Sequence, residues 1–322
     1  MNSADAASTL QTLTDELGRV FLGQAETVDG VLTAFLAGGH VLVEGVPGLG
    51  KTLLARTLST LTTGSFNRIQ FTPDLMPSDI TGSHVFNMKT REFEFYRGPV
   101  FCNILIADEI NRAPAKTHSA LLEVMAERQV SIDGKGFELP EPFFVIAAQN
   151  PLETEGTYAL PEAQLDRFMF KLLIDYPSEA READILRQAI GDSAPEKALQ
   201  RIEPILPVEQ LAQLSAGVEA VRVSDAIVDY ANQLVRATRR APAIETGASP
   251  RAGITLLKGA RVEAIIDGRD YVVPDDVRVL ALPALRHRIR LTPEAEVGGE
   301  RVDDILSALL ATVPVPGAAN ED

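Results

Sequence analysis

The stretch that decides the fold is Gly45-Val46-Pro47-Gly48-Leu49-Gly50-Lys51-Thr52. It fits the pattern G-x-x-x-x-G-K-[ST], in which glycines let backbone N–H groups wrap a phosphate and the helix that follows adds positive potential. An apolar run at 41–44 precedes it and a helical pattern at 52–61 follows it, as this motif requires. We expect Lys51 to reach the β- and γ-phosphates of a nucleotide and Thr52 to ligate Mg²⁺.

Two further apolar runs end in polar residues. Residues 104–107 lead into Asp108 and Glu109, and residues 143–148 lead, after one glutamine, into Asn150. We expect Asp108 to hold Mg²⁺ through water, Glu109 to orient and polarise an attacking water, and Asn150 to hydrogen-bond water and γ-phosphate. Alone, the two acids could start a solvated loop and Asn-Pro could start a turn. Their order behind a phosphate loop favours nucleotide hydrolysis.

The two halves of the chain differ in pattern. Short apolar runs alternate with helical patterns over residues 1–178, which indicates a doubly wound α/β sheet of parallel strands covered on both faces. The strands are expected at 41–44, 69–71, 103–108, 143–148 and 169–175. Residues 179–322 are expected to form a smaller all-helical domain, with helices at 179–190, 208–218, 225–239, 251–266 and 274–285.

Composition excludes several classes of protein. The 322 residues carry a formal charge of −15, which argues against a broad basic face for nucleic acid. One cysteine, Cys102, and four scattered histidines exclude a disulfide scaffold and a Cys/His zinc site. The N-terminus does not read as a signal peptide, and the uncharged stretch 30–43 is too short to span a bilayer. We therefore expect a cytoplasmic protein that meets a membrane only through a partner.

The ordered set of motifs resembles one family closely. The phosphate loop is followed by ILIADEINRAP from residue 104, VIAAQNP from 145, LPEAQLDRF from 160 and GASPRA from 247. This order resembles the AAA+ ATPase superfamily, and the wording resembles the MoxR family most closely, over about residues 15–310. The resemblance implies a P-loop AAA+ core followed by a helical lid, ATP hydrolysis with Mg²⁺, and assembly into a ring that is expected to be hexameric.

The resemblance also implies roles for individual residues around ATP. Gly23 and Gln24 fall in the segment that borders the adenine, and the loop from Gly45 to Thr52, with Leu53 after it, holds the phosphates. Asn150 matches the sensor-1 position.

Three arginines are candidates for the joints between subunits or domains. Arg167 matches the arginine finger that is offered to the adjacent subunit, and Arg251 matches sensor 2, with Ser249 as the N-cap of its helix. Arg112 could also face the neighbouring subunit, or form an ordinary surface ion pair, and the sequence leaves both readings open.

Two β-hairpins are expected as additions to this core. One covers residues 130–139 around the turn at 133–136, where related proteins carry a pre-sensor-1 hairpin. The other covers residues 84–96, where the helix-2-insert group has its extra element. Hairpins at these places point at the pore or at a partner in such families, although they could also only extend the surface.

The resemblance implies a chaperone-like remodeller or activator of partner proteins, among them proteins with a von Willebrand factor A domain. Three alternatives stay open: a magnesium-chelatase-like subunit, a nucleic-acid-linked AAA+ motor, and a nucleotide-dependent interaction switch with little hydrolysis. The basic stretch 286–290 is the best evidence for a nucleic-acid motor. We expect it instead to cap or solvate the end of a lid helix, and we expect no direct contact with nucleic acid.

Overall fold

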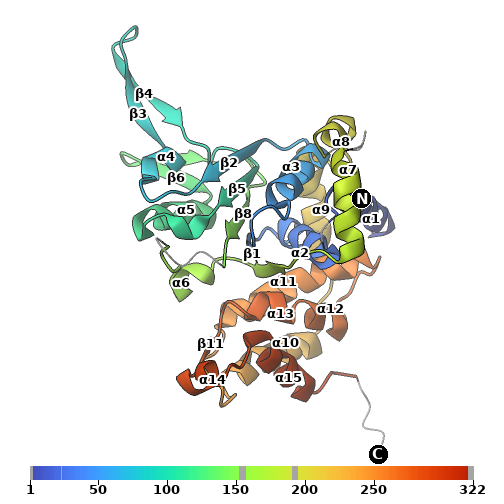
Figure 1. Cartoon of the computed structure of the whole chain (residues 1–322). Coiled ribbons are helices and arrows are strands. Elements are labelled where there is room, and N and C mark those ends of the chain that lie inside the picture. Colours follow the sequence, from blue (N-terminus) through green and yellow to red (C-terminus); the bar gives the residue numbers. More distant parts are fainter. Residues whose placement is uncertain (1–2, 23, 152–156, 191–194, 318–322) are drawn as a thin grey trace, which may run out of the picture.

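Five parallel strands form the centre of the first part of the chain (Figure 1). Their order across the sheet is β2-β5-β8-β1-β9, so the phosphate-loop strand β1 lies between β8 and β9. The computed structural model describes residues 3–22, 24–151, 157–190 and 195–317. The strands are β1 Val41–Gly45, β2 Phe66–Gln70, β5 Ile104–Asp108, β8 Phe144–Gln149 and β9 Phe170–Ile174. The predicted parallel sheet flanked by helices is confirmed.

Each face of the sheet meets its own apolar core. Ile104 and Ile106 of β5 belong to a core shared with the helices before and after the phosphate loop. Leu105 and Ala107, which point to the opposite face, belong to a second core under the helix that follows β5. All four side chains are fully buried, which explains why the interior strands read as continuous apolar runs.

The helices cover both faces of the sheet and then form the lid below it (Figure 1). In the first part they are α1 Ser3–Val20, α2 Ala25–Leu36, α3 Lys51–Leu61, α4 Pro77–Thr81, the 3₁₀ turn η1 Ile110–Arg112, α5 Ala115–Glu127 and α6 Glu162–Leu165. Those that follow are α7 Glu179–Ile190, α8 Pro195–Arg201, α9 Val208–Ala220, α10 Asp225–Thr238, α11 Pro250–Ile266, α12 Pro274–Val279, α13 Ala281–Leu285, α14 Pro293–Val297 and α15 Val302–Thr312. None of the helices in the described part of the chain has the length and apolar character needed to cross a bilayer.

Four short strands form the two predicted hairpins. β3 Gly82–Asn87 pairs with β4 Glu92–Arg97, and β6 Gln129–Ile132 pairs with β7 Lys135–Glu138. The second hairpin turns through the two residues Asp133 and Gly134, both with positive φ, rather than through four. In Figure 1 the β3–β4 hairpin projects away from the rest of the molecule.

Three elements differ from expectation for identifiable reasons. The second strand runs from Phe66 to Gln70 instead of 69–71. It lies at one edge of the sheet and carries exposed polar side chains, which obscured its start in the sequence. The helix expected at 274–285 divides into α12 and α13, since Pro283 has no N–H to donate to the carbonyl of Val279, where α12 ends. The helical lid also carries a small antiparallel pair, β10 Ile244–Thr246 and β11 Arg290–Leu291.

The basic stretch 286–290 turns inward and joins the lid to the sheet. The Arg288 side chain is only 2% exposed, and its Nε lies 2.6 Å from Asp166 Oδ1. Its remaining N–H groups donate to the carbonyls of Phe168 at 2.7 Å and Met169 at 3.0 Å, just before β9. A guanidinium in this position satisfies backbone groups that no ladder partner reaches. The stretch therefore does more than cap or solvate a helix end.

A half-buried carboxyl lies at a second contact between the two parts, where α11 packs on α2. Glu263 accepts a hydrogen bond from Thr33 Oγ1 at 2.7 Å. Burial, with smaller contributions from Asp29 and other nearby acids, raises the pKa of Glu263 to about 7. The native state therefore favours the protonated form of this side chain.

Replacing Arg288 by Met should lower the free energy of unfolding by about 3 kcal/mol, because Asp166 and two carbonyls lose a buried partner. The matched control is Arg290→Ala, two residues along, whose half-exposed guanidinium pairs with Glu245 and Glu162 and should change stability by less than about 1 kcal/mol. Urea unfolding followed by circular dichroism measures both. Equal effects of the two substitutions would contradict the proposed joint.

Glu263→Gln should stabilise the protein at pH 8 and have little effect at pH 5. A carboxyl whose pKa is raised in the folded state contributes stability below its unfolded pKa and loses it as pH rises through the folded value near 7. The difference in unfolding free energy between variant and wild type should grow by roughly 2 kcal/mol between pH 5 and pH 8. Glu209→Gln, on the exposed surface of α9, is the control and should show no such trend.

Candidate functional site

The phosphate loop lies where β1 ends and α3 begins. Gly48 and Gly50 have φ values of +87° and +80°, a left-handed conformation that glycine adopts readily. α3 starts directly at Lys51, so its first free N–H groups face the loop. The geometry matches a cradle for phosphate, built from backbone donors at a helix N-terminus.

The Lys51 ammonium bridges two neighbouring strands. It donates to the carbonyl of Gly45 at the end of β1 and to that of Gln149 at the end of β8, the latter at 3.4 Å. Burial lowers the pKa of Lys51, and the nearby carboxylates of Asp108, Glu44 and Glu109 oppose this effect. The charged form is therefore supported by acids at the same edge of the sheet.

Both predicted acids lie at the carboxyl end of β5, and two residues of β2 hold them. Asp108 Oδ2 is 2.8 Å from Arg68 Nη2. Glu109 has a left-handed backbone with φ of 54°, and its Oε2 accepts from Gln70 Nε2 at 2.6 Å. Sequence reasoning missed Arg68 and Gln70. Their spacing of two, at the end of a strand that lies beside the acidic one, is the signal that could have found them.

Arg112 contacts the acids of its own chain in this structure. Its Nε lies 3.1 Å from Glu109 Oε2. The side chain is 40% exposed, so this pair is well solvated and contributes little to stability.

A single cavity of about 430 Å³ brings most of the predicted residues together. It lies at the carboxyl ends of parallel strands, where α/β proteins bind ligands. Its walls combine an ammonium, a hydroxyl, two carboxylates and a side-chain amide, a donor set that fits a polyphosphate and Mg²⁺. The lining residues are Pro47, Gly48, Leu49, Gly50, Lys51, Thr52, Leu53, Arg68, Asp108, Glu109, Gln149 and Asn150.

Three further predicted residues of the nucleotide site, Gln24, Gly45 and Val46, do not line this cavity. Gly45 and Val46 belong to the phosphate loop. Gln24 is the N-cap residue of α2, and Gly23 lies outside the described residues. The segment before them reaches the loop, because a Cβ on Gly50 would lie 3.1 Å from the ring of Phe21. Phe21, three residues before Gln24, is therefore adjacent to the phosphate loop.

Neither Arg167 nor Arg251 lines the cavity of its own chain. Arg167 Nη1 donates to the carbonyl of Leu122 in α5 at 2.7 Å. Arg251 is exposed at the start of α11, where Ser249 Oγ accepts from its backbone N–H at 3.2 Å, so the predicted N-cap is confirmed. The two segments are linked, since Ser249 also donates to Asp166 at 3.3 Å.

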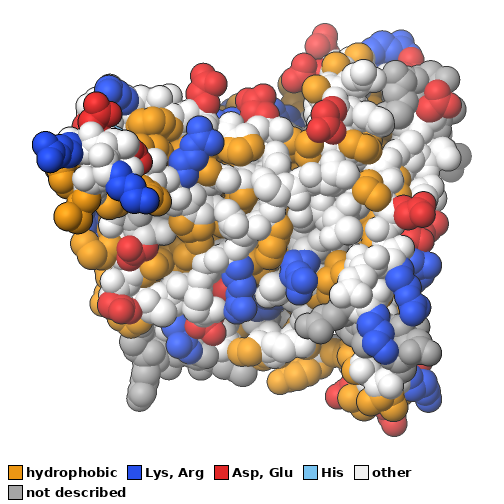
Figure 2. Space-filling view, turned by 90° about the horizontal axis from the view of Figure 1, so that it is seen from above, with side chains coloured by type: hydrophobic (Ala, Val, Ile, Leu, Met, Phe, Trp, Pro, Cys, Tyr) orange, Lys and Arg blue, Asp and Glu red, His pale blue; other side chains and the backbone are white. Residues whose placement is uncertain are grey.

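The β3–β4 hairpin, near its base, packs on β7 and on the turn of the second hairpin. The rings of Phe95 and Phe137 have centroids 4.2 Å apart, and His84 Nδ1 lies 2.9 Å from Asp133 Oδ2. Toward the tip the β3–β4 hairpin exposes large apolar side chains, including Phe93 at 70%. Val85, Phe86 and Met88 are also exposed, and Tyr96 is exposed nearer the base, where it pairs with Ser83. In Figure 2 apolar side chains gather among charged ones at the left, the side on which this hairpin projects in Figure 1.

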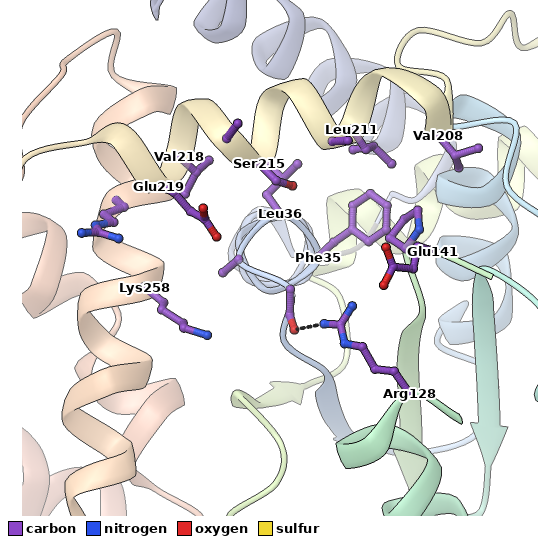
Figure 3. A pocket seen from close by; sticks show the side chains of 16 residues that line it. Phe35, Leu36, Arg128, Glu141, Val208, Leu211, Ser215, Val218, Glu219 and Lys258 are labelled. Atoms are coloured by element: carbon purple, nitrogen blue, oxygen red, sulfur yellow. Dashed lines mark hydrogen bonds between the residues drawn. The ribbon is translucent and has the colours of Figure 1, made fainter. Parts of the chain in front are cut away.

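A second cavity, of about 810 Å³, lies near the amino ends of the strands (Figure 3). Its walls include Phe35 and Leu211, together with Lys258. Arg128 donates to the carbonyl of Gly38 at 3.0 Å, at the C-terminal end of α2, where a cation complements the helix dipole. Arg128 is thus explained by the fold, and no phosphate-loop chemistry lines this cavity.

Comparison with known proteins agrees with this geometry. The model of the ATPase family associated with various cellular activities (AAA) matches residues 40–170, and an AAA lid domain matches residues 236–309. The chain is 46% identical to the uncharacterised protein YeaC of Bacillus subtilis, covering 94% of this chain and 93% of that one. It is 43% identical to the chaperone MoxR1 of Mycobacterium tuberculosis, covering 96% and 82%.

A crystal structure of a candidate ATPase from Cytophaga hutchinsonii superposes with a TM-score of 0.89 at 39% identity, covering 97% of this chain and 96% of that one. The 38 kDa magnesium-chelatase subunit of Acidiphilium rubrum is more distant, at 29% identity over 66% of this chain. The first three of these proteins share 39–46% identity with almost the whole chain, and the phosphate loop and the two acids meet at one cavity. The chain therefore belongs to the MoxR family of AAA+ ATPases.

Proposed function

We propose that this chain binds ATP with Mg²⁺ in the cavity at the ends of β1, β5 and β8, hydrolyses it to ADP and phosphate, and uses the cycle to remodel partner proteins. The observation that carries the proposal is the convergence of Lys51, Thr52, Asp108, Glu109 and Asn150 on one cavity. Five side chains from two strand ends and the start of one helix meet there, although they lie up to 99 positions apart in the sequence.

The residues divide the work by their chemistry. Lys51 and the loop N–H groups bind the phosphates, while the Thr52 hydroxyl and Asp108, through water, are placed to hold Mg²⁺. When bound, Mg²⁺ supplies positive charge that offsets the charge developing on the phosphates. Glu109 orients and polarises the attacking water, and Asn150 fixes the same water by hydrogen bonding.

Hydrolysis is proposed to depend on assembly into a ring, with a hexamer as the expected size. Arg167 lies on the side of α5, away from its own cavity, and so is available to a neighbouring subunit after leaving the Leu122 carbonyl. Arg251 starts α11 of the lid and would sense the nucleotide from that side. An arginine supplied by a neighbour makes turnover a property of the ring.

The projecting β3–β4 hairpin is the proposed contact with partner proteins. Exposed aromatic and methionine side chains on a narrow, solvent-surrounded hairpin are typical of surfaces that bind proteins. The family resemblance favours a partner with a von Willebrand factor A domain. Arg288 faces inward, so the stretch 286–290, which would favour a nucleic-acid motor, loses one of its three arginines as a possible contact for nucleic acid.

Glu109→Gln should lower steady-state ATP turnover by at least about 100-fold and leave nucleotide binding intact, because the amide cannot accept the proton of the attacking water. A coupled phosphate-release assay measures turnover, and a fluorescent ATP analogue measures binding. Glu127→Gln, an exposed glutamate at the end of α5, is the control and should retain full activity.

Unchanged turnover in Glu109→Gln would refute the assignment of Glu109. Binding of ATP without measurable turnover in the wild type would instead support the interaction switch. Light scattering of the Glu109→Gln protein with ATP then reports the size of the assembly.

Mixing two inactive variants tests whether Arg167 acts on a neighbour. Arg167→Ala and Lys51→Ala should each lose roughly 10³-fold or more in turnover when assayed alone. In a mixed ring, a Lys51→Ala subunit can offer its intact Arg167 to the intact phosphate loop of an Arg167→Ala subunit. The mixture should therefore recover a measurable fraction of wild-type turnover. Recovery also shows that both variants fold.

If Arg167 served its own chain, the mixture would stay as inactive as its components. The control is a mixture of Lys51→Ala with Glu109→Gln, in which both defects affect the same cavity of their own chain. That mixture should show no recovery whichever role Arg167 has.

A further inference from the structure

Arg68 lies in the wall of the nucleotide cavity, although no motif marks it. In the parallel pairing of β2 with β5, Arg68 is the partner of Ile106 and Gln70 is the partner of Asp108. Residues two apart on a strand point to the same face, so both β2 side chains lie on the Asp108 side of the sheet. The cavity places the Arg68 guanidinium among Lys51 and Thr52, where the phosphates and Mg²⁺ are expected.

One nitrogen of Arg68 makes two contacts that connect both acids. Nη2 lies 2.8 Å from Asp108 Oδ2 and donates to Gln70 Oε1 at 3.0 Å. Because the Gln70 amide oxygen accepts from Arg68, the NH₂ group of the same amide points away from Arg68. It donates to Glu109 Oε2 at 2.6 Å. The orientation of Glu109 is thus linked through Gln70 to the position of Arg68.

The contact between Arg68 and Asp108 is built to be exchangeable. The Arg68 side chain is 50% exposed, and a solvated ion pair of this kind contributes little to stability. Asp108 is also the carboxylate that the proposed function assigns to Mg²⁺. A guanidinium and a hydrated divalent cation both bind carboxylate oxygens, so they compete for Asp108, and their mutual repulsion disfavours simultaneous binding.

We propose that Arg68 is a positioning residue that occupies Asp108 before nucleotide arrives and exchanges it for oxygens of the terminal phosphate when Mg²⁺–nucleotide binds. The exchange also removes the contact that fixes the Gln70 amide, so the hydrogen bond from Gln70 to Glu109 loses its support while Arg112 stays beside Glu109. This inference rests on the proposed function, since it requires that the cavity bind Mg²⁺ and nucleotide.

The test measures binding rather than turnover. Fluorescent analogues of ADP and ATP are titrated against the wild-type chain and Arg68→Ala over a range of Mg²⁺ concentrations. In Arg68→Ala, the Mg²⁺ concentration that gives half-maximal affinity for the diphosphate should fall roughly two- to five-fold, because a competing cation is gone. The preference for triphosphate over diphosphate should fall about tenfold, because the fork that holds the terminal phosphate is lost.

Two variants serve as controls. Arg56→Ala removes an exposed arginine of α3 that does not line the cavity, and it should keep both wild-type values. Arg68→Lys keeps the charge and should keep the wild-type Mg²⁺ requirement. If Arg68→Ala folds poorly by circular dichroism, Arg68→Gln retains most of the stem without the charge and should show the same two shifts.

Unchanged Mg²⁺ dependence and unchanged triphosphate preference in the neutral variants would overturn the role of Arg68 and leave the proposed function intact. If Arg56→Ala also lowered the Mg²⁺ requirement and the triphosphate preference, the effect would be one of net charge. That result would also overturn the role of Arg68. Failure of the wild-type chain to bind either nucleotide with Mg²⁺ is a distinct result, because it would refute the proposed function itself.

Discussion

The buried guanidinium of Arg288 fixes the geometry on which the rest of the molecule depends. It enters from the lid and binds Asp166 together with the carbonyls that precede β9. Asp166 in turn accepts from Ser249, the N-cap of α11. The segment that carries Arg167 and the helix that begins beside Arg251 are therefore held by one cation. Without it, the positions of the two arginines proposed to read the nucleotide would not be fixed relative to each other.

The ion pairs of this acidic chain fall into two kinds that differ in burial. Arg288 is 2% exposed, so separating it from Asp166 would leave uncompensated buried charge at a cost of about 3–5 kcal/mol. Arg68 is 50% exposed, and its pair with Asp108 gives about 1 kcal/mol or less. The first pair fixes a joint, whereas the second can be exchanged by a ligand. Burial, more than distance, separates the permanent contact from the replaceable one.

The interior of the sheet and its β9 edge were predictable from sequence, whereas most of the β2 edge was not. β5 and β8 are buried on both faces, so their side chains had to be apolar and their polar ends stood out. β2 is an edge strand that was expected only at 69–71, and its polar residues Arg68 and Gln70 hid its first part and its contribution to the site. The role of Arg288 was missed for a related reason, because a charged residue in a basic stretch is expected to be exposed to solvent. In both cases a tertiary partner, which single-sequence patterns cannot show, decides the role.

The chain connects the cavity to one hairpin, and two side-chain contacts connect that hairpin to the projecting one. Asn150 follows β8, and the chain reaches β8 from β7, whose Phe137 ring packs on Phe95 of β4. The pair of His84 with Asp133 fixes the same two hairpins at a second point. Two contacts at different places restrict rotation as well as separation, so the hairpins must move together if either moves. A shift of β8 as a whole would therefore reach both hairpins together, and the proposed remodelling of a partner requires a path of this kind.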